Sequence, residues 1–192
     1  MDKATCKAQL RTIIRTKRLE LSSQQQLIAE RGLAKCARQS VHLLKAKRIL
    51  SYSPFAGEVS PQKTVHTLSA SDVYLPRITN FRCRKMQFYR VNEQQSLNKY
   101  GIIEPIQNKH PLATNAFDVI LLPLIAFDRT GARVGMGAGY YDRALAALSH
   151  QRSTKPYLIG LAHHFQEVNS IESAPWDVRL DAILTDLEFI QI

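Results

Sequence analysis

The sequence predicts an α/β protein: a single-domain, three-layer α/β/α fold with a mostly parallel sheet, behind a basic N-terminal helical segment. Three observations predict it. Helical periodicity dominates only the first 48 residues, short apolar runs then alternate with helical segments, and two of those runs are almost wholly apolar. The chain has 192 residues and is 45% hydrophobic, which is enough for one domain over residues 1–192 with a sizeable core.

A basic helix is expected over about residues 3–20. Leu10, Ile13, Ile14 and Leu21 recur at helical spacing. Cations also recur every three or four residues, and at about 3.6 residues per turn they line one stripe beside the apolar one. The stripe consists of Lys3, Lys7, Arg11, Arg15 and Arg18. A solvated helix face is the alternative interpretation of such a stripe.

A second helix is expected to begin at Ser22 or Ser23. Either serine suits the N-cap, with Gln25 or Gln26 at the reciprocal position of a capping box. The helical spacing predicts a buried apolar face made of Leu27, Ala34, Ala37, Val41 and Leu44.

Strands are expected where short apolar, β-branched and aromatic runs follow, at residues 49–53, 73–75, 86–91, 117–122, 157–161 and 182–185. The run 117–122 is apolar except for Asp118, and 157–161 is equally apolar, as in strands buried on both faces. Helical segments lie between some runs, at about residues 61–70 and 139–149. This alternation favours a Rossmann-like parallel sheet, in which ligands bind at the carboxyl ends of strands.

Composition limits the function classes. The net charge is +10 and the excess lies mainly before residue 49, so an anionic partner is expected, although the charge does not say which one. No apolar stretch is long enough for a bilayer span, and the polar start does not resemble a signal peptide, so we expect a cytoplasmic protein without a membrane partner. Cys6, Cys36 and Cys83 are far apart and form no CxxC pair, so neither a disulfide framework nor a zinc site is indicated.

Residues 128–143 carry the strongest chemical signal. Residues 128–131 read D-R-T-G, a tight turn with glycine last, and Gly135, Gly137 and Gly139 then alternate before a helix. Such glycines let backbone N–H groups approach phosphate oxygens, and Arg133 adds a cation. The segment is neither a Walker A loop nor the dinucleotide fingerprint. A glycine-rich turn without a ligand is the alternative interpretation.

Several ordered motifs together resemble the 5-formyltetrahydrofolate cyclo-ligase family. Residues 127–143 contain F-D-x-x-G, an arginine and G-x-G-x-G-Y-Y-D-R, which is similar to the family signature. The basic first helix, Y-S-P-F-A-G-E-V at 52–59, Y-G-I-I-E-P at 100–105, L-I-G-L-A at 158–162 and D-V-R-L-D-A-I-L-T at 177–185 also look like family elements. The resemblance covers nearly the whole chain.

The resemblance implies an enzyme that uses ATP, with Mg²⁺ as cofactor, to convert 5-formyltetrahydrofolate into 5,10-methenyltetrahydrofolate, releasing ADP and phosphate. A formamide is a poor electrophile, so phosphorylation of the formyl oxygen would activate its carbon for attack by N10. Such an enzyme must hold two anionic substrates in line and neutralise the moving phosphoryl group. We expect a monomer or a weak dimer.

The resemblance also implies roles for particular residues. Catalysis falls to Arg133 and Tyr140, and the metal to Asp142 and Asp177. The ATP site comprises Lys7, Ala8, Gln9, Leu10, Arg11, Arg133, Val134, Gly135, Met136, Gly137, Ala138, Gly139, Tyr140 and Tyr141. The folate site comprises Ser53, Glu58, Met136, Gly137, Ala138, Gly139 and Tyr140.

From the residues alone, other interpretations stay open. Asp142 fits the first turn of a helix, Asp177 and Asp181 fit turn caps, and Glu58 fits an exposed loop. His163 and His164 are interpreted as structural, because neighbouring strand residues point to opposite faces. The whole protein could instead bind nucleic acid, although no such motif is present and this partner is disfavoured, or be another α/β enzyme of nucleotides or sugar phosphates.

Overall fold

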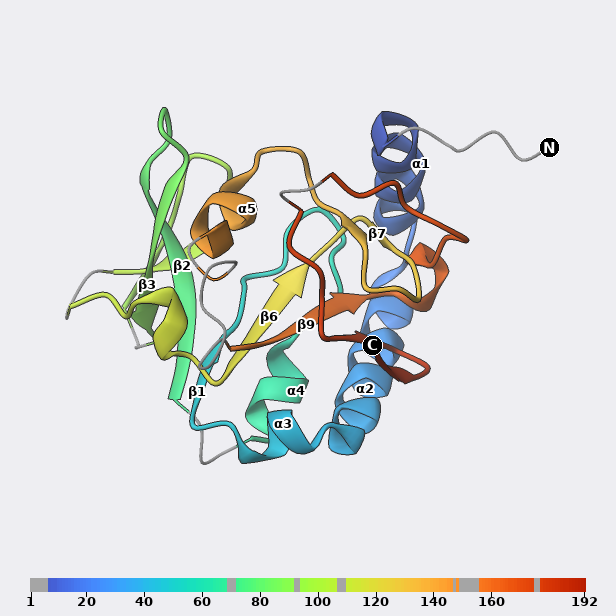
Figure 1. Cartoon of the computed structure of the whole chain (residues 1–192), viewed down its shortest axis with the longest axis horizontal. Helices are drawn as coiled ribbons and strands as arrows, with labels where there is room; N and C mark the ends of the chain where they lie inside the picture. The colour runs from blue at the N-terminus through green and yellow to red at the C-terminus, as the bar shows by residue number, and fades with distance from the viewer. Residues whose placement is uncertain are drawn as a thin grey trace.

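A seven-stranded sheet runs through the middle of the protein in the computed structural model, which describes residues 7–68, 72–91, 94–106, 110–146, 148, 156–174 and 177–192 (Figure 1). The strand order is β11-β10-β9-β6-β1-β2-β3. These strands are β1 (Arg48–Leu50), β2 (Asp72–Asn80), β3 (Lys85–Arg90), β6 (Val119–Pro123), β9 (Tyr157–Ala162), β10 (Ala182–Thr185) and β11 (Phe189–Gln191). Every run predicted to be a strand contributes to this sheet.

The sheet is parallel in its centre and antiparallel at its edges. β2, β1, β6, β9 and β10 pair in parallel, whereas β3 and β11 pair antiparallel with their neighbours β2 and β10. The predicted mostly parallel α/β sheet is therefore confirmed. Two small antiparallel pairs stand outside it: β4 (Gln95–Leu97) with β5 (Ile103–Pro105), and β7 (Ala126–Phe127) with β8 (Arg133–Val134).

Two buried clusters lie on opposite faces of the sheet, because alternate strand residues point to opposite sides. Leu121 and Ile159 pack beneath α2 (Ser23–Cys36), α3 (Val41–Lys45) and α4 (Gln62–His66). Ile120 and Leu158 pack on the other side beneath α5 (Tyr140–Leu145). The basic helix α1 (Lys7–Leu19) lies beside β7, which is outside the seven-stranded sheet (Figure 1).

The sequence predicted where the helices begin better than it predicted which of their faces are buried. α1 is described from Lys7, so the predicted residues 3–6 lie outside the described chain. Ser22 caps α2, and Gln25 completes the capping box as expected. Where the structure describes the helices, none is both long and apolar enough to cross a membrane.

The predicted apolar face of the second helix was wrong in part. Leu27, Val41 and Leu44 are 39%, 58% and 53% exposed. α2 ends at Cys36, a short turn follows, and Ser40 starts α3 by accepting a hydrogen bond from the Leu43 amide. This break changes the helical phase after Cys36, which leaves Val41 and Leu44 exposed and buries Leu43. Within α2 itself the buried residues are Ala29, Leu33 and Cys36.

The strand order changes direction beside β1. As a result, the loop that follows β1 and the loop that follows β6 begin next to each other. The chain moves from β1 outward to β2 and β3, then crosses to β6 on the other side of β1. In open α/β sheets, ligands bind outside the carboxyl ends of the strands at such a switch point. The segments after β1 and β6, beginning at Ser51 and Leu124, leave the sheet there.

Candidate active site

A cavity of about 360 Å³ lies at the carboxyl ends of β1, β2 and β6. Its sheet side is formed by Tyr52, Ser53, Phe55 and Glu58 after β1, with Pro123 at the end of β6. Its other side comes from α1, the hairpins β2–β3 and β4–β5, the glycine loop and the start of α5: Arg15, Pro76, Ile78, Met86, Asn98, Tyr100, Ile102, Ile103, Glu104, Arg133, Gly135, Met136, Gly137, Ala138, Gly139, Tyr140, Tyr141 and Asp142. The size suits a small organic ligand, and the lining is largely apolar.

A second, smaller cavity of about 150 Å³ adjoins the first. It is polar, and α1, the glycine loop and the C-terminal segment all contribute to it. Its lining is Lys7, Arg11, Arg133, Val134, Gly135, Gly137, Gly139, Asp142 and Asp177. Arg133, Gly135, Gly137, Gly139 and Asp142 line both cavities, so the glycine loop is their common wall.

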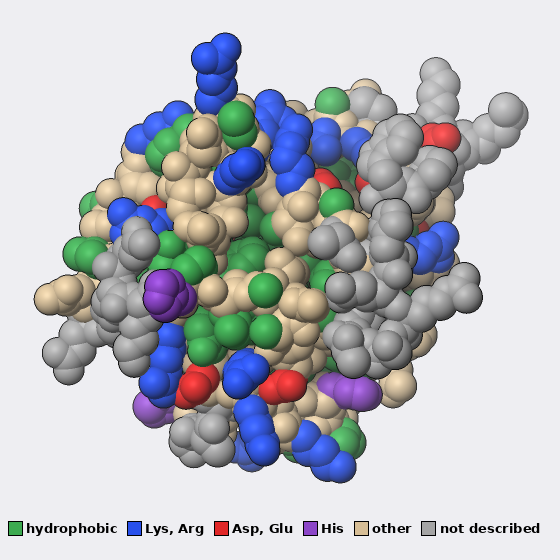
Figure 2. Space-filling view, turned by 60° about the vertical axis from the view of Figure 1, so that its left-hand side comes forward, with side chains coloured by type: hydrophobic (Ala, Val, Ile, Leu, Met, Phe, Trp, Pro, Cys, Tyr) green, Lys and Arg blue, Asp and Glu red, His purple; other side chains and the backbone are tan. Residues whose placement is uncertain are grey.

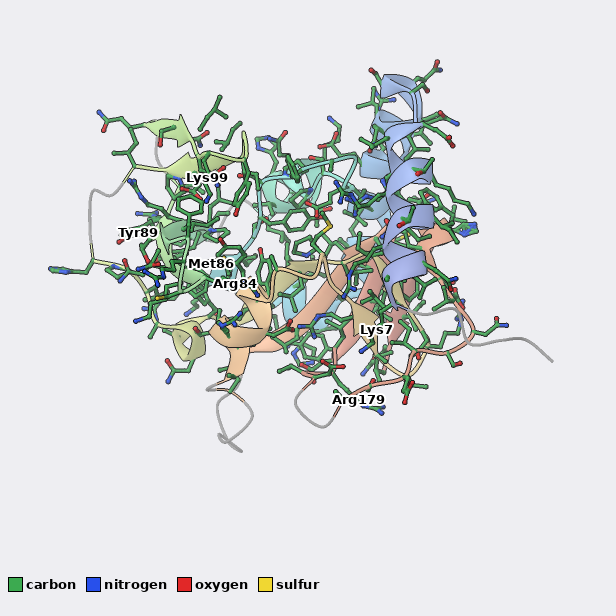
Figure 3. All side chains as sticks on the ribbon, turned by 90° about the horizontal axis from the view of Figure 1, so that it is seen from above. Lys7, Arg84, Met86, Tyr89, Lys99 and Arg179 are labelled. Carbon is green, nitrogen blue, oxygen red and sulfur yellow. The ribbon has the colours of Figure 1, made fainter. Side chains whose placement is uncertain are left out.

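The view from above shows how the two sides face each other (Figure 3). Met86 and Arg84 lie on the hairpin side, Lys7 lies at α1, and the chain leading from β8 into α5 passes between them. Figure 2 shows the face that bears β3, where hydrophobic side chains gather near the middle between groups of Lys and Arg. A ligand that spans both cavities would meet a mainly apolar lining in the larger one and Lys7, Arg11 and Arg133 in the smaller one.

The glycine loop, residues 135–139, has a backbone conformation that residues other than glycine rarely adopt. Gly137 and Gly139 have φ of 91° and 70°, in the left-handed region that favours glycine. A Cβ atom on Gly137 would lie 3.3 Å from the Arg11 Nε atom. Arg11 Nε donates to the Gly135 carbonyl oxygen at 2.9 Å, which ties the loop to α1. Before the loop, Asp128 accepts from the Thr130 and Ala132 amides and closes the predicted tight turn.

Cations and carboxylates are already paired in the smaller cavity. Lys7 Nζ lies 3.1 Å from Asp177, and an Arg133 nitrogen lies 3.0 Å from Asp142. Burial alone would raise the pKa of Asp177, but the Ala174 amide and Lys7 outweigh it and hold that pKa below its usual value. Burial lowers the pKa of Arg133, while Asp142 and Asp177 oppose that shift, and the guanidinium stays charged.

The two carboxylates suit a Mg²⁺ ion that is held mainly by a ligand's phosphates. Mg²⁺ is commonly bound through one or two carboxylates, substrate phosphates and water. Asp142 and Asp177 line one cavity, with side chains 52% and 28% exposed. Within the described ranges no group of three or more His, Cys, Asp and Glu residues could hold a metal. The donor set therefore fits a phosphate-bridged ion and not an all-protein cage.

Glu58 is buried at the inner wall of the larger cavity, so its alternative interpretation as an exposed loop residue was wrong. Its side chain is 7% exposed, 3.9 Å from an Arg18 nitrogen, and its Oε2 atom accepts from the Phe55 amide at 3.0 Å. Burial raises the pKa of Glu58 to about 7, although Arg18 and the Phe55 amide oppose the rise. Ser53 lines the same cavity and donates to the Ile103 carbonyl oxygen at 2.7 Å.

The two tyrosines at the start of α5 have different surroundings. Tyr141 packs against the buried cluster beneath α5, and burial raises its pKa strongly. Tyr140 faces the larger cavity, where burial first and a hydrogen bond with Tyr100 second raise its pKa. Both tyrosines line the larger cavity, and Tyr140 is the one whose hydroxyl pairs with another lining residue, Tyr100.

Other predicted residues lie farther from the cavities. Ala8 and Gln9 are exposed and line neither one, while Leu10 packs against a buried cluster that includes Val134. His163 follows the end of β9, so the strand argument about it was wrong, but its ring is buried and its Nε2 lies 3.1 Å from the Gly57 carbonyl oxygen.

Sequence reasoning missed the hairpin wall and the depth of Arg18. The motif at residues 100–105 resembles a family element but predicts no role for its residues, although Tyr100, Ile103 and Glu104 line the larger cavity. Glu104 accepts from the Ile78 amide at 3.0 Å, which fixes the β4–β5 hairpin against β2. Arg18 is a member of the basic stripe whose side chain is fully buried. The pattern of apolar and polar residues predicts neither the position of the hairpins at the cavity nor the burial of Arg18.

Comparisons with known proteins agree on one family. The model of the 5-formyltetrahydrofolate cyclo-ligase family matches residues 3–186. The chain is 37% identical to the 5-formyltetrahydrofolate cyclo-ligase of Haemophilus influenzae, over 92% of this chain and 95% of that protein. It is 32% identical to the Escherichia coli K12 protein of the same name, over 90% and 96%. The NMR structure of Aquifex aeolicus 5,10-methenyltetrahydrofolate synthetase aligns with a TM-score of 0.81 at 26% identity, over 97% and 93%.

Proposed function

The chain belongs to the 5-formyltetrahydrofolate cyclo-ligase family, and from that premise we propose that its two adjoining cavities hold the two substrates of one reaction. The enzyme converts 5-formyltetrahydrofolate to 5,10-methenyltetrahydrofolate with ATP, the reaction of its family. The observation that carries the proposal is the shared glycine-loop wall, because a phosphoryl group must pass from one substrate to the other across it.

The ATP phosphates occupy the smaller cavity in this proposal. Lys7, Arg11 and Arg133 supply cations there, and the glycines of the loop let backbone groups approach. Lys7 and Arg133 leave their carboxylate partners for phosphate oxygens when the nucleotide binds. Asp142 and Asp177 would then be free to hold Mg²⁺, which would neutralise charge on the phosphates. Arg133 and Arg11 keep the γ-phosphoryl group facing the common wall.

The folate occupies the larger cavity, with its formyl group at the common wall. Apolar residues of the hairpins cover its ring system, and Glu58 accepts hydrogen bonds from polar ring groups at the inner wall. Transfer of the γ-phosphoryl group to the formyl oxygen makes that oxygen a good leaving group. N10 then attacks the formyl carbon and phosphate departs. The Tyr140 hydroxyl, which lines the larger cavity, orients the formyl group for this transfer.

Several parts of the proposal extend the sequence predictions. We keep one domain over residues 1–192, supported by the family match over residues 3–186. Cytoplasmic location and a monomeric or weakly dimeric state also stay predictions. Nucleic-acid binding is less well supported, because Lys7, Arg11 and Arg18 contact protein groups. Filter binding of RNA across a salt series tests it; strong, salt-sensitive binding without ATP turnover would favour it.

The test is a spectrophotometric assay of ring closure with 5-formyltetrahydrofolate, ATP and Mg²⁺. The variants are Arg11→Ala and Asp142→Asn, with Lys17→Gln as control, because Lys17 is an exposed cation of the same helix. Losing a charge-assisted contact to phosphate lowers kcat/KM for ATP by roughly 10- to 100-fold. For Asp142→Asn, the Mg²⁺ concentration that gives half the maximal rate rises as well.

Each role can fail separately. Wild-type protein that does not form methenyltetrahydrofolate would refute the activity. Wild-type kinetic constants for Arg11→Ala or Asp142→Asn would refute the role of that residue alone. A Tyr140→Phe variant with unchanged KM for folate and unchanged kcat would remove the orienting role of the Tyr140 hydroxyl.

A further inference from the structure

Arg18 is a fully buried cation that is bound almost entirely by backbone. Its side chain is 0% exposed. Its Nε and Nη2 atoms donate to the Ala56 carbonyl oxygen at 3.1 and 2.8 Å, and longer contacts of 3.4 Å reach the carbonyls of Phe55 and Leu124. The guanidinium of α1 therefore holds together the ends of the two loops that leave β1 and β6.

The turn at residues 55–58, to which Arg18 donates its hydrogen bonds, has a strained backbone conformation. In residues 55–58 the Glu58 amide donates to the Phe55 carbonyl oxygen at 3.1 Å. Ala56 and Gly57 have φ of 49° and 73°, and a left-handed alanine is strained. Such a turn persists only when its surroundings fix it. Arg18 fixes it, because its Nε and Nη2 atoms donate to the carbonyl oxygens of Phe55 and Ala56, and Nη2 also lies 3.9 Å from the Glu58 carboxylate.

The same guanidinium is the counter-charge of the carboxylate that the turn presents. Glu58 lies 3.9 Å from the Arg18 Nη2 atom. The groups that face Glu58 are Arg18 from α1, Tyr52 after β1 and Tyr141 from α5, together with the Phe55 amide. Among these groups Arg18 alone carries positive charge.

We propose that Arg18 is a positioning residue of the folate site: it locks the left-handed turn at residues 55–58 and supplies the counter-charge that holds the Glu58 carboxylate toward the larger cavity. The inference rests on the proposed function, in which Glu58 contacts the folate. Arg18 itself does not line either cavity, so it acts through Glu58. Its role therefore differs from that of Lys7 and Arg11 of the same helix, which line the smaller cavity.

The test is a double-mutant cycle of Arg18→Gln and Glu58→Gln, with Arg18→Lys as the conservative variant and Lys17→Gln as the matched control. Arg18→Gln raises KM for 5-formyltetrahydrofolate by about tenfold or more, the value of one charge-assisted interaction, and changes KM for ATP less than about twofold. In the Glu58→Gln background the same substitution has little further effect, because the residue through which it acts is already changed. Arg18→Lys gives an intermediate KM for folate.

A pH profile adds a readout that a merely structural role would not move. The wild-type kcat/KM for folate falls on the acid side as Glu58 is protonated, near its pKa of about 7. Without the Arg18 charge this acid limb moves to higher pH, because Arg18 opposes the effect of burial on Glu58. In Lys17→Gln the limb stays in place.

Three results would overturn the proposal. One is an equal rise in KM for ATP and folate, which indicates general damage. Another is an undiminished effect of Arg18→Gln in the Glu58→Gln background. The third is loss of the fold in both Arg18 variants, as followed by circular dichroism. An inactive wild type, or Glu58→Gln with wild-type KM for folate, would instead refute the proposed function on which this inference rests.

Discussion

Replacing Glu58 by Gln tests the electrostatics of the folate cavity without any substrate. The pKa of Glu58 is raised from the usual 4.5 to about 7, chiefly by burial. The folded state therefore binds a proton more tightly than the unfolded state does. Between the two values the folded state holds more protons, so the free energy of unfolding falls as pH rises from 4.5 to 7 and is level above that range.

The size of the effect follows from the same two values. Each pH unit between them corresponds to about 1.4 kcal/mol, so ionised Glu58 costs the folded state roughly 3 kcal/mol above pH 7. The side chain is 7% exposed, so solvent screens little of this cost. From pH 5 to pH 8, the wild type is expected to lose roughly 2 to 3 kcal/mol relative to Glu58→Gln, which has no proton to release.

The assay is urea unfolding of both proteins at pH 5, 6, 7 and 8, at one ionic strength. Other titrating groups are common to the two proteins, so the difference between their free energies of unfolding isolates Glu58. A difference that does not vary with pH would refute the reasoning. A wild type that gains stability relative to the variant as pH rises would show that Arg18 outweighs burial and holds the pKa below its usual value.

Four further substitutions test particular contacts. Gly57→Ala should lower the free energy of unfolding by about 2 to 4 kcal/mol, because its Cβ would lie 2.5 Å from the Arg18 carbonyl oxygen at φ 73°. Gly101→Ala, at φ 76° with no atom of the described residues within 4 Å of the added Cβ, should lower the free energy of unfolding by only about 1 to 2 kcal/mol in the same urea titration. Thr64→Val should add about 1 kcal/mol, since the buried Thr64 hydroxyl lacks a hydrogen-bond partner among the described residues; a loss would show that it has one. Gly137→Ala should raise KM for ATP in steady-state assays, because its Cβ would crowd Arg11; an unchanged KM would contradict this.

The strands were predictable because their signal is local. β6 and β9 are apolar on both faces, as strands in the middle of a parallel sheet must be, and their sequences show this directly. The Ser22 capping box and the turn at Asp128 were predictable for the same reason, since each is closed by side chains within four residues.

The remainder depends on contacts between distant residues. The end of α2 at Cys36 follows from packing, and no strong breaker marks it. Arg18 and Lys17 are neighbours in one basic run, yet one is buried and the other exposed. What separates them is a partner at residues 55–58, about 38 positions away, which no periodicity shows. The roles of the site residues came from motif resemblance, whereas their depth and pairing came only from the fold.

The paired charges of the smaller cavity have a consequence for how its occupants arrive. Lys7, Arg11 and Arg133 carry three positive charges and Asp142 and Asp177 carry two negative charges, so the charged lining of the cavity leaves one positive charge in excess. In the proposed assembly, a lone divalent cation would add to a surplus of positive charge, and a lone polyphosphate would meet two carboxylates. Only the metal–nucleotide chelate lets both ion pairs exchange partners at once. Calorimetric titration would then register strong heat for the chelate and little for either component by itself.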